Sequence, residues 1–126
     1  MLQKIPFPSN FRQRQIVFLF YIMLIAVVSL VPSDSRSLPV KHIDKVGHFL
    51  AYVLMAVLAL VSYEKRGGQI SAVLLTVVIA ILLEWGQSFV PGRLATLTDG
   101  ITNMLGLLGG VLLYGYYFRR LGNSDG

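Results

Sequence analysis

A few polar side chains interrupt otherwise apolar stretches of this chain, and their spacing places them on shared helix faces. Asp99, Asn103 and Gly106 follow one another at intervals of four and three residues, so a helix would stack them on one side. Glu84 and Gln87 lie three residues apart at the end of the preceding apolar stretch. A charged side chain at the centre of a membrane helix costs about 2.5–3.5 kcal/mol on insertion scales. Such groups must therefore be paired, hydrated or used in function.

Three of the ionisable side chains are candidates for acid–base catalysis. Histidine changes its charge near neutral pH, so His48 is a candidate general base or proton relay. Glu84 lies about 9 Å from the end of its apolar stretch at 1.5 Å per residue, so it must be protonated, paired with a cation or exposed to a hydrated cavity. Asp99 begins the last stretch, where Thr98 or Asp99 would cap the helix and a negative charge suits the helix dipole. Each residue also has a purely structural interpretation. His48 could lie at the level of the lipid head groups and bond to a neighbouring helix, and Arg93 could form a salt bridge with Glu84 or Asp99 that holds the loop in place.

Basic residues near these carboxylates favour a binding site for an anionic head group. Arg93 follows Glu84 in the next loop, and its planar guanidinium can form two parallel hydrogen bonds to a carboxylate or phosphate. Lys41 and Lys45 precede His48. The candidate ligand-binding residues are Lys45, His48, Glu84, Gln87, Arg93, Asp99 and Asn103.

Two further patterns concern packing. Asp44 is interpreted as a helix N-cap; if the helix includes it, Asp44, His48 and Tyr52 stack along one face at intervals of four residues. Gly106 and Gly110 form a G-x-x-x-G pair, which lets another helix approach closely. We expect this approach to bring Asn103 next to Glu84 and Gln87.

The composition is that of a membrane protein. Of 126 residues, 55% are hydrophobic and 13% are charged, whereas soluble domains carry about 25% charged residues. The absence of cysteine excludes disulfides and Cys-ligated zinc. The net charge of +5 comes from short basic groups that flank apolar runs, so no nucleic-acid partner is expected. No metal-ligand spacing and no phosphate-binding or hydrolase motif occurs in the sequence, so neither a metal nor a cofactor is expected.

Four apolar stretches predict an all-α fold, a single membrane domain over residues 1–126 with four transmembrane helices. A cleaved signal peptide is the alternative for the first stretch, but Val28-Ser29-Leu30 is a poor cleavage site. Seven Lys and Arg residues flank one side and four flank the other, which predicts cytoplasmic N and C termini. The polar residues of the last three helices would then converge in the extracytoplasmic half of the bundle. The expected helices span residues 15–32, 45–64, 69–90 and 99–119.

The same residues resemble the pattern of the VanZ-like family of small bacterial membrane proteins, over residues 40–115. This resemblance implies a multi-pass protein of the bacterial cytoplasmic (inner) membrane. The family is named after a protein linked to resistance to the glycopeptide antibiotic teicoplanin, and most members have no assigned biochemistry. The matching pieces are Asp44-Lys45-x-x-His48-Phe49-x-x-Tyr52, Glu84-x-x-Gln87-x-Phe89-x-Pro91-x-Arg93 and Asp99-x-x-x-Asn103-x-x-Gly106-x-x-x-Gly110.

Three functions are compatible with these features. The first is a pocket that binds an envelope lipid or another amphiphile, such as a lipoglycopeptide antibiotic. The second is a membrane-embedded enzyme acting on a lipid-linked envelope substrate, with Glu84 or His48 as general base and Arg93 as charge stabiliser. The third is a structural bundle locked by its polar residues. Membrane lipids are expected partners in each case, and the sequence leaves oligomerisation open.

Overall fold

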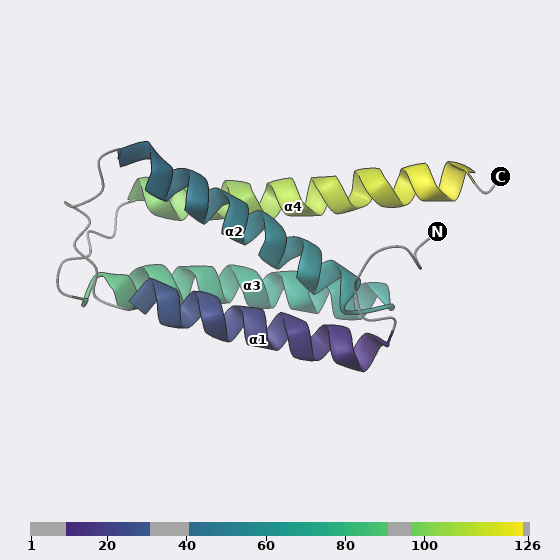
Figure 1. Cartoon of the computed structure of the whole chain (residues 1–126), viewed down its shortest axis with the longest axis horizontal. Coiled ribbons are helices and arrows are strands. Elements are labelled where there is room, and N and C mark those ends of the chain that lie inside the picture. Colours follow the sequence, from purple (N-terminus) through teal and green to yellow (C-terminus); the bar gives the residue numbers. More distant parts are fainter. Residues whose placement is uncertain (1–9, 31–40, 91–96, 125–126) are drawn as a thin grey trace.

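The computed structural model describes residues 10–30, 41–90 and 97–124, and the regular structure within these ranges is entirely helical (Figure 1). It contains four helices: α1 (Phe11–Leu30), α2 (Lys41–Val61), α3 (Arg66–Gln87) and α4 (Leu97–Ser124). The predicted all-α fold is confirmed. Arg93 and the loop around it lie outside the described residues, as do the side chains of Lys41 and Asp44.

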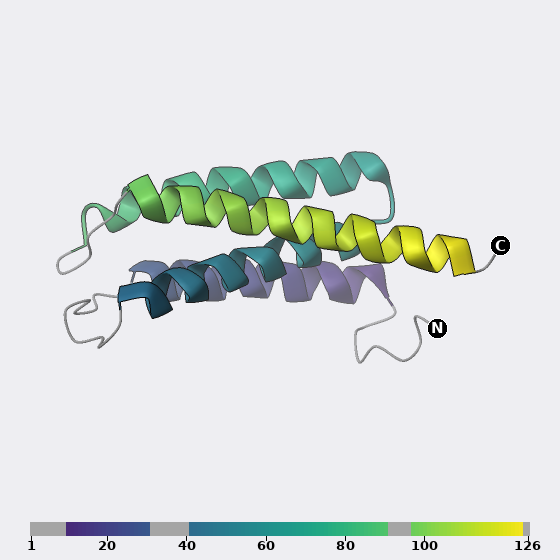
Figure 2. The same cartoon turned by 90° about the horizontal axis from the view of Figure 1, so that it is seen from above.

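Successive helices run in opposite directions, so α1 begins and α4 ends at the same end of the bundle (Figures 1 and 2). This end, where α3 begins, is called the Arg66 end, and the opposite end, where α3 finishes, is called the Glu84 end. Helix α2 crosses the bundle obliquely and contacts the other three helices, most extensively α4. Within the described helices, α1 and α4 make no contact. Helix α2 is therefore the element around which the bundle is organised.

The helices begin earlier than the apolar stretches predicted, because polar residues at their ends continue the helical backbone. Asn10 accepts a hydrogen bond from the amide of Arg12 through its side-chain oxygen (3.0 Å), which allows α1 to begin at Phe11. Since α2 begins at Lys41 and α4 at Leu97, Asp44 and Asp99 lie inside the first turn of their helices. The N-cap interpretation of both residues is therefore wrong. Asp99 still faces the positive end of the helix dipole from this position.

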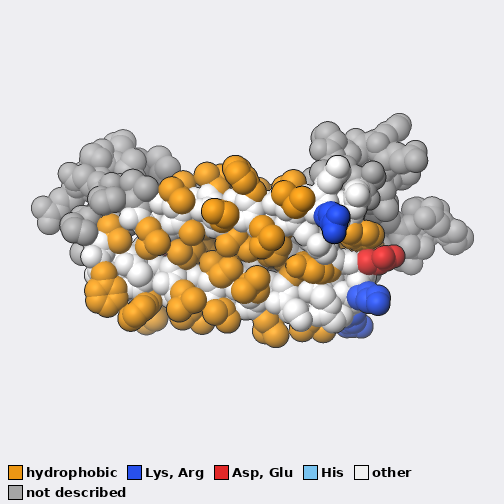
Figure 3. Space-filling view, turned by 90° about the horizontal axis from the view of Figure 1, so that it is seen from below, with side chains coloured by type: hydrophobic (Ala, Val, Ile, Leu, Met, Phe, Trp, Pro, Cys, Tyr) orange, Lys and Arg blue, Asp and Glu red, His pale blue; other side chains and the backbone are white. Residues whose placement is uncertain are grey.

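Three helices are long and apolar enough to cross a membrane: Phe11–Leu30, Arg66–Gln87 and Leu97–Phe118. The apolar part of α2, Lys45–Val61, is shorter. Large apolar side chains are exposed along the sides of the bundle, and the Lys, Arg, Asp and Glu side chains visible in Figure 3 gather at the Arg66 end. This distribution suits a surface surrounded by lipid with charges at the interface. The chain is thus a multi-pass membrane protein.

Glycines allow α4 to pack directly on the backbone of α2. A Cβ atom added at Gly106 would lie 2.6 Å from the carbonyl oxygen of Phe49 and 3.0 Å from Cβ of Tyr52. A Cβ at Gly110 would meet the carbonyl oxygen of Val53 and, at 2.7 Å, Cβ of Ala56. The sequence prediction of a close helix approach at this glycine pair agrees with these contacts, and the partner is α2.

Gln69 joins α2, α3 and α4 near the Arg66 end. Its side-chain amide donates to the carbonyl oxygens of Leu60 (3.0 Å) and Tyr63 (3.1 Å). The same amide also donates to the hydroxyl oxygen of Tyr114 (3.1 Å). Carbonyl groups at a helix C-terminus lack intrahelical partners, and these bonds satisfy two of them in the last turn of α2 and just beyond it. Side-chain hydrogen bonds from Gln69 therefore tie α2, α3 and α4 together at the Arg66 end.

Candidate functional site

Five polar side chains from three helices meet near the Glu84 end, and we call this group the polar cluster. Glu84 of α3 interacts electrostatically with Asp99 of α4 and His48 of α2. Tyr52 of α2 interacts electrostatically with Glu84, and Asn103 of α4 bonds to it. The members of the polar cluster are His48, Tyr52, Glu84, Asp99 and Asn103.

Local structure explains why these side chains converge. His48 and Tyr52 lie one turn apart on α2, as do Asp99 and Asn103 on α4, so each pair presents one face to its neighbours. The close approach of α4 to α2 at Gly106, less than one turn beyond Asn103, brings these two faces together. Glu84, three residues before the end of α3, then completes the cluster from the third helix.

The hydrogen bonding of Glu84 and Asn103 is incomplete. The side-chain amide of Asn103 donates to Glu84 Oε2 over 3.4 Å, a long bond. Glu84 Oε1 and Asn103 Oδ1 are both buried, and neither has a partner among the described residues. Asn103 is only 2% exposed, so water does not reach it freely. Buried polar atoms in proteins are rarely left unpaired, so these two acceptor oxygens set the site apart from the rest of the described bundle.

A groove of about 710 Å³ lies against the cluster, between the second half of α3 and the first half of α4. We call it the Glu84 groove. Most of its lining is apolar, and Glu84 and Ser88 contribute its polar side chains, with Trp85 exposed on its wall. The complete lining is Ala80, Ile81, Glu84, Trp85, Ser88, Leu97, Gly100, Ile101, Met104, Leu105 and Leu108. A carboxylate thus lies partway along a mostly apolar groove on the side of the bundle.

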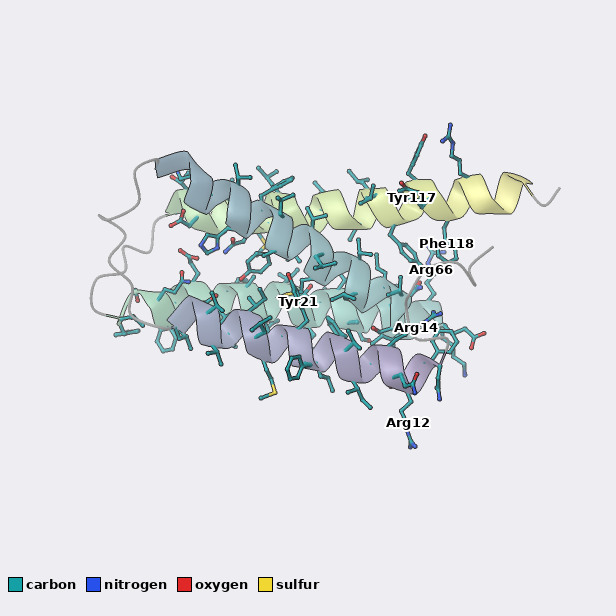
Figure 4. All side chains as sticks on the ribbon, in the orientation of Figure 1. Arg12, Arg14, Tyr21, Arg66, Tyr117 and Phe118 are labelled. Atoms are coloured by element: carbon teal, nitrogen blue, oxygen red, sulfur yellow. The ribbon has the colours of Figure 1, made fainter. Side chains whose placement is uncertain are left out.

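One further tyrosine, Tyr21 of α1, extends the cluster beyond Tyr52. The hydroxyl of Tyr21 donates to the carbonyl oxygen of Ala51 over 2.7 Å, and Tyr21 interacts electrostatically with Tyr52. In Figure 4, Tyr21 lies in the interior of the bundle, toward α2. Tyr21 was not among the residues predicted for the site. The sequence did contain a signal for it, because a tyrosine hydroxyl in the middle of the first apolar stretch needs a hydrogen-bond partner inside the bundle.

The structure brings together four of the candidate ligand-binding residues, His48, Glu84, Asp99 and Asn103. Gln87 is not among them. It is buried, and its amide donates to the carbonyl oxygen of Ser29 on α1 (3.1 Å), so the expected contact with Asn103 is wrong. Gln87 lies three residues after Glu84, and this offset turns it toward α1 instead of α4.

The two remaining candidates are basic. Lys45 is partly buried and makes no hydrogen bond or ion pair with the cluster within the ranges that the structure describes. Arg93 lies outside those ranges, so its predicted bridge to Glu84 or Asp99 remains a prediction. Among the described side chains, no group of three or more His, Asp and Glu residues is arranged to hold a metal ion.

The chemistry available at this site is that of hydrogen-bond acceptors beside a histidine. A carboxylate oxygen and an amide oxygen can accept bonds from hydroxyl, amide or ammonium groups. His48 and Glu84 together can also hold or exchange a proton. The groove beside them suits an apolar chain, so the site matches a molecule with a polar head and an apolar tail.

Comparison with known proteins identifies one family. The family model described as VanZ/LLP1 matches residues 5–119. No curated protein and no solved structure matches the chain.

Proposed function

Since the chain belongs to the VanZ/LLP1 family, which matches nearly its whole length, we propose that it binds an amphiphile of the cell envelope in the Glu84 groove. The head group would bond to the polar cluster, and the apolar tail would lie between α3 and α4. The observation that carries this proposal is the pair of buried, unpartnered oxygens, Glu84 Oε1 and Asn103 Oδ1.

The two oxygens define the chemistry of the head group. Both are acceptors, so the ligand must supply donors, such as the hydroxyl groups of a sugar or the amide and ammonium groups of a peptide. A bond to a charged acceptor contributes about 1.5–3 kcal/mol, whereas leaving it unmade costs a similar amount. Lipid-linked envelope precursors and lipoglycopeptides such as teicoplanin combine such donors with an apolar chain.

The shape of the groove suits the tail. Its α4 wall extends from Leu97 to Leu108, which is about 16 Å at 1.5 Å per residue. This length covers about half of a hydrocarbon core of roughly 30 Å, the depth of one leaflet. A tail in the groove would therefore run from the interface toward the membrane centre.

The charge distribution supports an orientation in which the Glu84 end faces outward. The basic residues of the described chain concentrate at the Arg66 end, and positive charge favours the cytoplasmic side. In this orientation both termini are cytoplasmic, and the site opens to the outer leaflet of the bacterial inner membrane. Those basic residues include Arg12, Arg14, Lys65, Arg66 and Arg120.

Binding can be tested with the full chain in lipid nanodiscs, using teicoplanin and its deacylated form as probes. We expect saturable binding of the acylated form and at least tenfold weaker binding of the deacylated form. Glu84→Gln should weaken binding about tenfold, because one charged hydrogen bond is replaced by a neutral one. Gly100→Leu should block the groove, because Gly100 lines it and nothing lies within 4 Å of an added Cβ.

Gly115→Leu is the matched control, since its added Cβ also meets open space on α4 but lies in a different groove. It should bind teicoplanin as the unmodified chain does. Equal binding by the Gly100→Leu and unmodified proteins would refute the proposed groove. Absence of binding by the unmodified protein would refute lipoglycopeptides as ligands, and the same titration with a short-chain lipid-linked diphosphate sugar would then test envelope precursors.

The enzymatic alternative is favoured by one observation, the proximity of His48 and Asp99 to Glu84. This arrangement can move a proton to or from a bound head group. Turnover of the lipid-linked diphosphate sugar, lost in Glu84→Gln while binding persists, would support the enzyme. Loss of membrane accumulation in Glu84→Gln, Asp99→Asn and Arg93→Lys alike, with neither binding nor turnover in the unmodified protein, would favour the structural role.

A further inference from the structure

A second groove, of about 830 Å³, lies on the same seam between α3 and α4 but at the Arg66 end of the bundle. We call it the Arg66 groove. It is separate from the Glu84 groove, with no lining residue in common. Its lining is Leu60, Glu64, Arg66, Gln69, Ile70, Val73, Leu74, Val111, Leu112, Tyr114, Gly115 and Tyr116. No step of the proposed function uses it.

Apolar and polar residues divide this groove along its length. From Val73 to Arg66 the α3 wall covers about 11 Å at 1.5 Å per residue. The deep part is formed by aliphatic side chains such as Val73 and Val111, and the mouth by Glu64, Arg66 and the tyrosines. The order matches a phospholipid, whose acyl chains lie in the hydrocarbon and whose phosphate lies at the interface.

Basic residues gather around the mouth of the groove. Arg66 lines it together with Glu64, the one acidic residue of the lining, and Lys65 and Arg120 lie at the same end of the bundle. Within the part of the chain that the structure describes, Arg66 makes no hydrogen bond or ion pair. Figure 4 shows its side chain between the beginning of α3 and the later turns of α4. Its guanidinium is therefore available to an anion at the mouth.

Tyr114 supplies a second donor. Its hydroxyl oxygen accepts a hydrogen bond from Gln69 (3.1 Å), and this bond fixes the position of the hydroxyl. The hydroxyl proton remains available to an acceptor in the groove that Tyr114 lines. Arg66 and Tyr114 together present donors to a group that carries only acceptors, which is the chemistry of a phosphodiester.

We infer that the Arg66 groove is a binding site for an anionic phospholipid, with its phosphate at Arg66 and Tyr114 and an acyl chain along Val73 and Val111. Basic pockets between membrane helices on the cytoplasmic side are suited to such head groups. The inference is independent of the amphiphile proposed for the Glu84 groove, because it uses different residues and the opposite end of the bundle.

The test is native mass spectrometry of the full chain released from nanodiscs that contain equal amounts of phosphatidylglycerol and phosphatidylcholine with identical acyl chains. We expect the unmodified protein to retain one phosphatidylglycerol molecule in preference to phosphatidylcholine. Arg66→Gln should reduce this preference about fivefold, the effect of one basic residue near an anionic lipid. Arg12→Gln is the charge-matched control, since Arg12 is exposed at the same end and points away from the bundle in Figure 4.

Two glycine variants separate this site from the other groove. Gly115→Leu should fill the Arg66 groove and abolish retention of the lipid, because nothing lies within 4 Å of its added Cβ. Gly100→Leu fills the other groove and should retain phosphatidylglycerol normally. Helix content from circular dichroism verifies that each variant is folded.

Several results would overturn the inference. These are equal retention of both lipids by the unmodified protein, normal selectivity in Arg66→Gln or Gly115→Leu, and an equal loss in Arg12→Gln, which would indicate attraction by diffuse charge. Retention of phosphatidylcholine or of a second protein copy in place of phosphatidylglycerol would also refute it. Loss of teicoplanin binding in Gly100→Leu alone concerns only the Glu84 groove, so the two proposals fail independently.

Discussion

Replacing Gly110 with alanine should push α4 away from α2 and destabilise the bundle. The added Cβ would lie 2.7 Å from Cβ of Ala56 and would also meet the carbonyl oxygen of Val53. Carbon atoms pack best at about 3.5–4.0 Å, so the two helices must separate locally by about 0.8 Å. The carbonyl oxygen belongs to the α2 backbone and cannot rotate away as a flexible side chain would.

The magnitude follows from two opposing effects. Overpacking of this kind costs about 1–3 kcal/mol. Alanine is the better helix former by about 0.8–1.0 kcal/mol, which offsets part of that cost. Gly115→Ala gains the same propensity without the clash, because nothing lies within 4 Å of its Cβ. The difference in unfolding free energy between the two variants should therefore be about 1–3 kcal/mol, with Gly110→Ala the less stable.

The assay is reversible unfolding in mixed detergent micelles, followed by far-ultraviolet circular dichroism. Gly109→Ala provides an intermediate control, since its Cβ would meet Phe49 and Val53 side chains at ordinary distances of 3.6 and 3.7 Å. It should be at least as stable as the unmodified protein. Equal stability of the Gly110→Ala and Gly115→Ala proteins would show that α4 does not pack on the α2 backbone through this glycine.

Two further predictions concern interhelical hydrogen bonds. Gln87→Leu removes the hydrogen bond to α1 and should lower the unfolding free energy by about 0.6–1.7 kcal/mol in the same detergent assay, the range for such bonds in membranes. Ser88 is exposed and its hydroxyl bonds only to Trp85 in its own segment, so the control variant Ser88→Ala should change the unfolding free energy little. Gln69→Leu leaves the carbonyl groups at the end of α2 without their donor and removes the hydrogen bond to the hydroxyl of Tyr114. Amide hydrogen exchange in the last turn of α2 should therefore accelerate, and unchanged exchange there would contradict this role of Gln69.

The location of the polar cluster was predictable because its members are exceptions within apolar stretches. His48, Glu84, Asp99 and Asn103 each lie near a helix end, and alternating helix directions bring those ends to the same level. The alternation follows from short connections between successive helices. The level of these residues along the bundle could therefore be predicted without the tertiary structure.

The rotation of each helix was not predictable in the same way. Gln87 and Glu84 share a helix segment and both are polar, yet Gln87 bonds to α1 and Glu84 to α4. Tyr21 was missed because nothing in its apolar surroundings distinguishes a side that faces α2 from a side that faces lipid. The boundaries also shifted, since backbone hydrogen bonding continues through polar residues such as Arg12 and Lys41 that hydropathy assigns to loops.

The sequence by itself determined the helical class, the membrane setting, the family resemblance and the level at which the polar groups meet. Only the tertiary structure decided which faces touch, that the glycine pair of α4 packs on α2, and that the seam between α3 and α4 contains two grooves with different chemistry at their ends. The physical reason is that lipid is as apolar as a protein core. A membrane helix can be apolar on every side, so the hydrophobic pattern that orients helices in water carries little information about rotation, and packing of small residues and hydrogen bonds determines it instead.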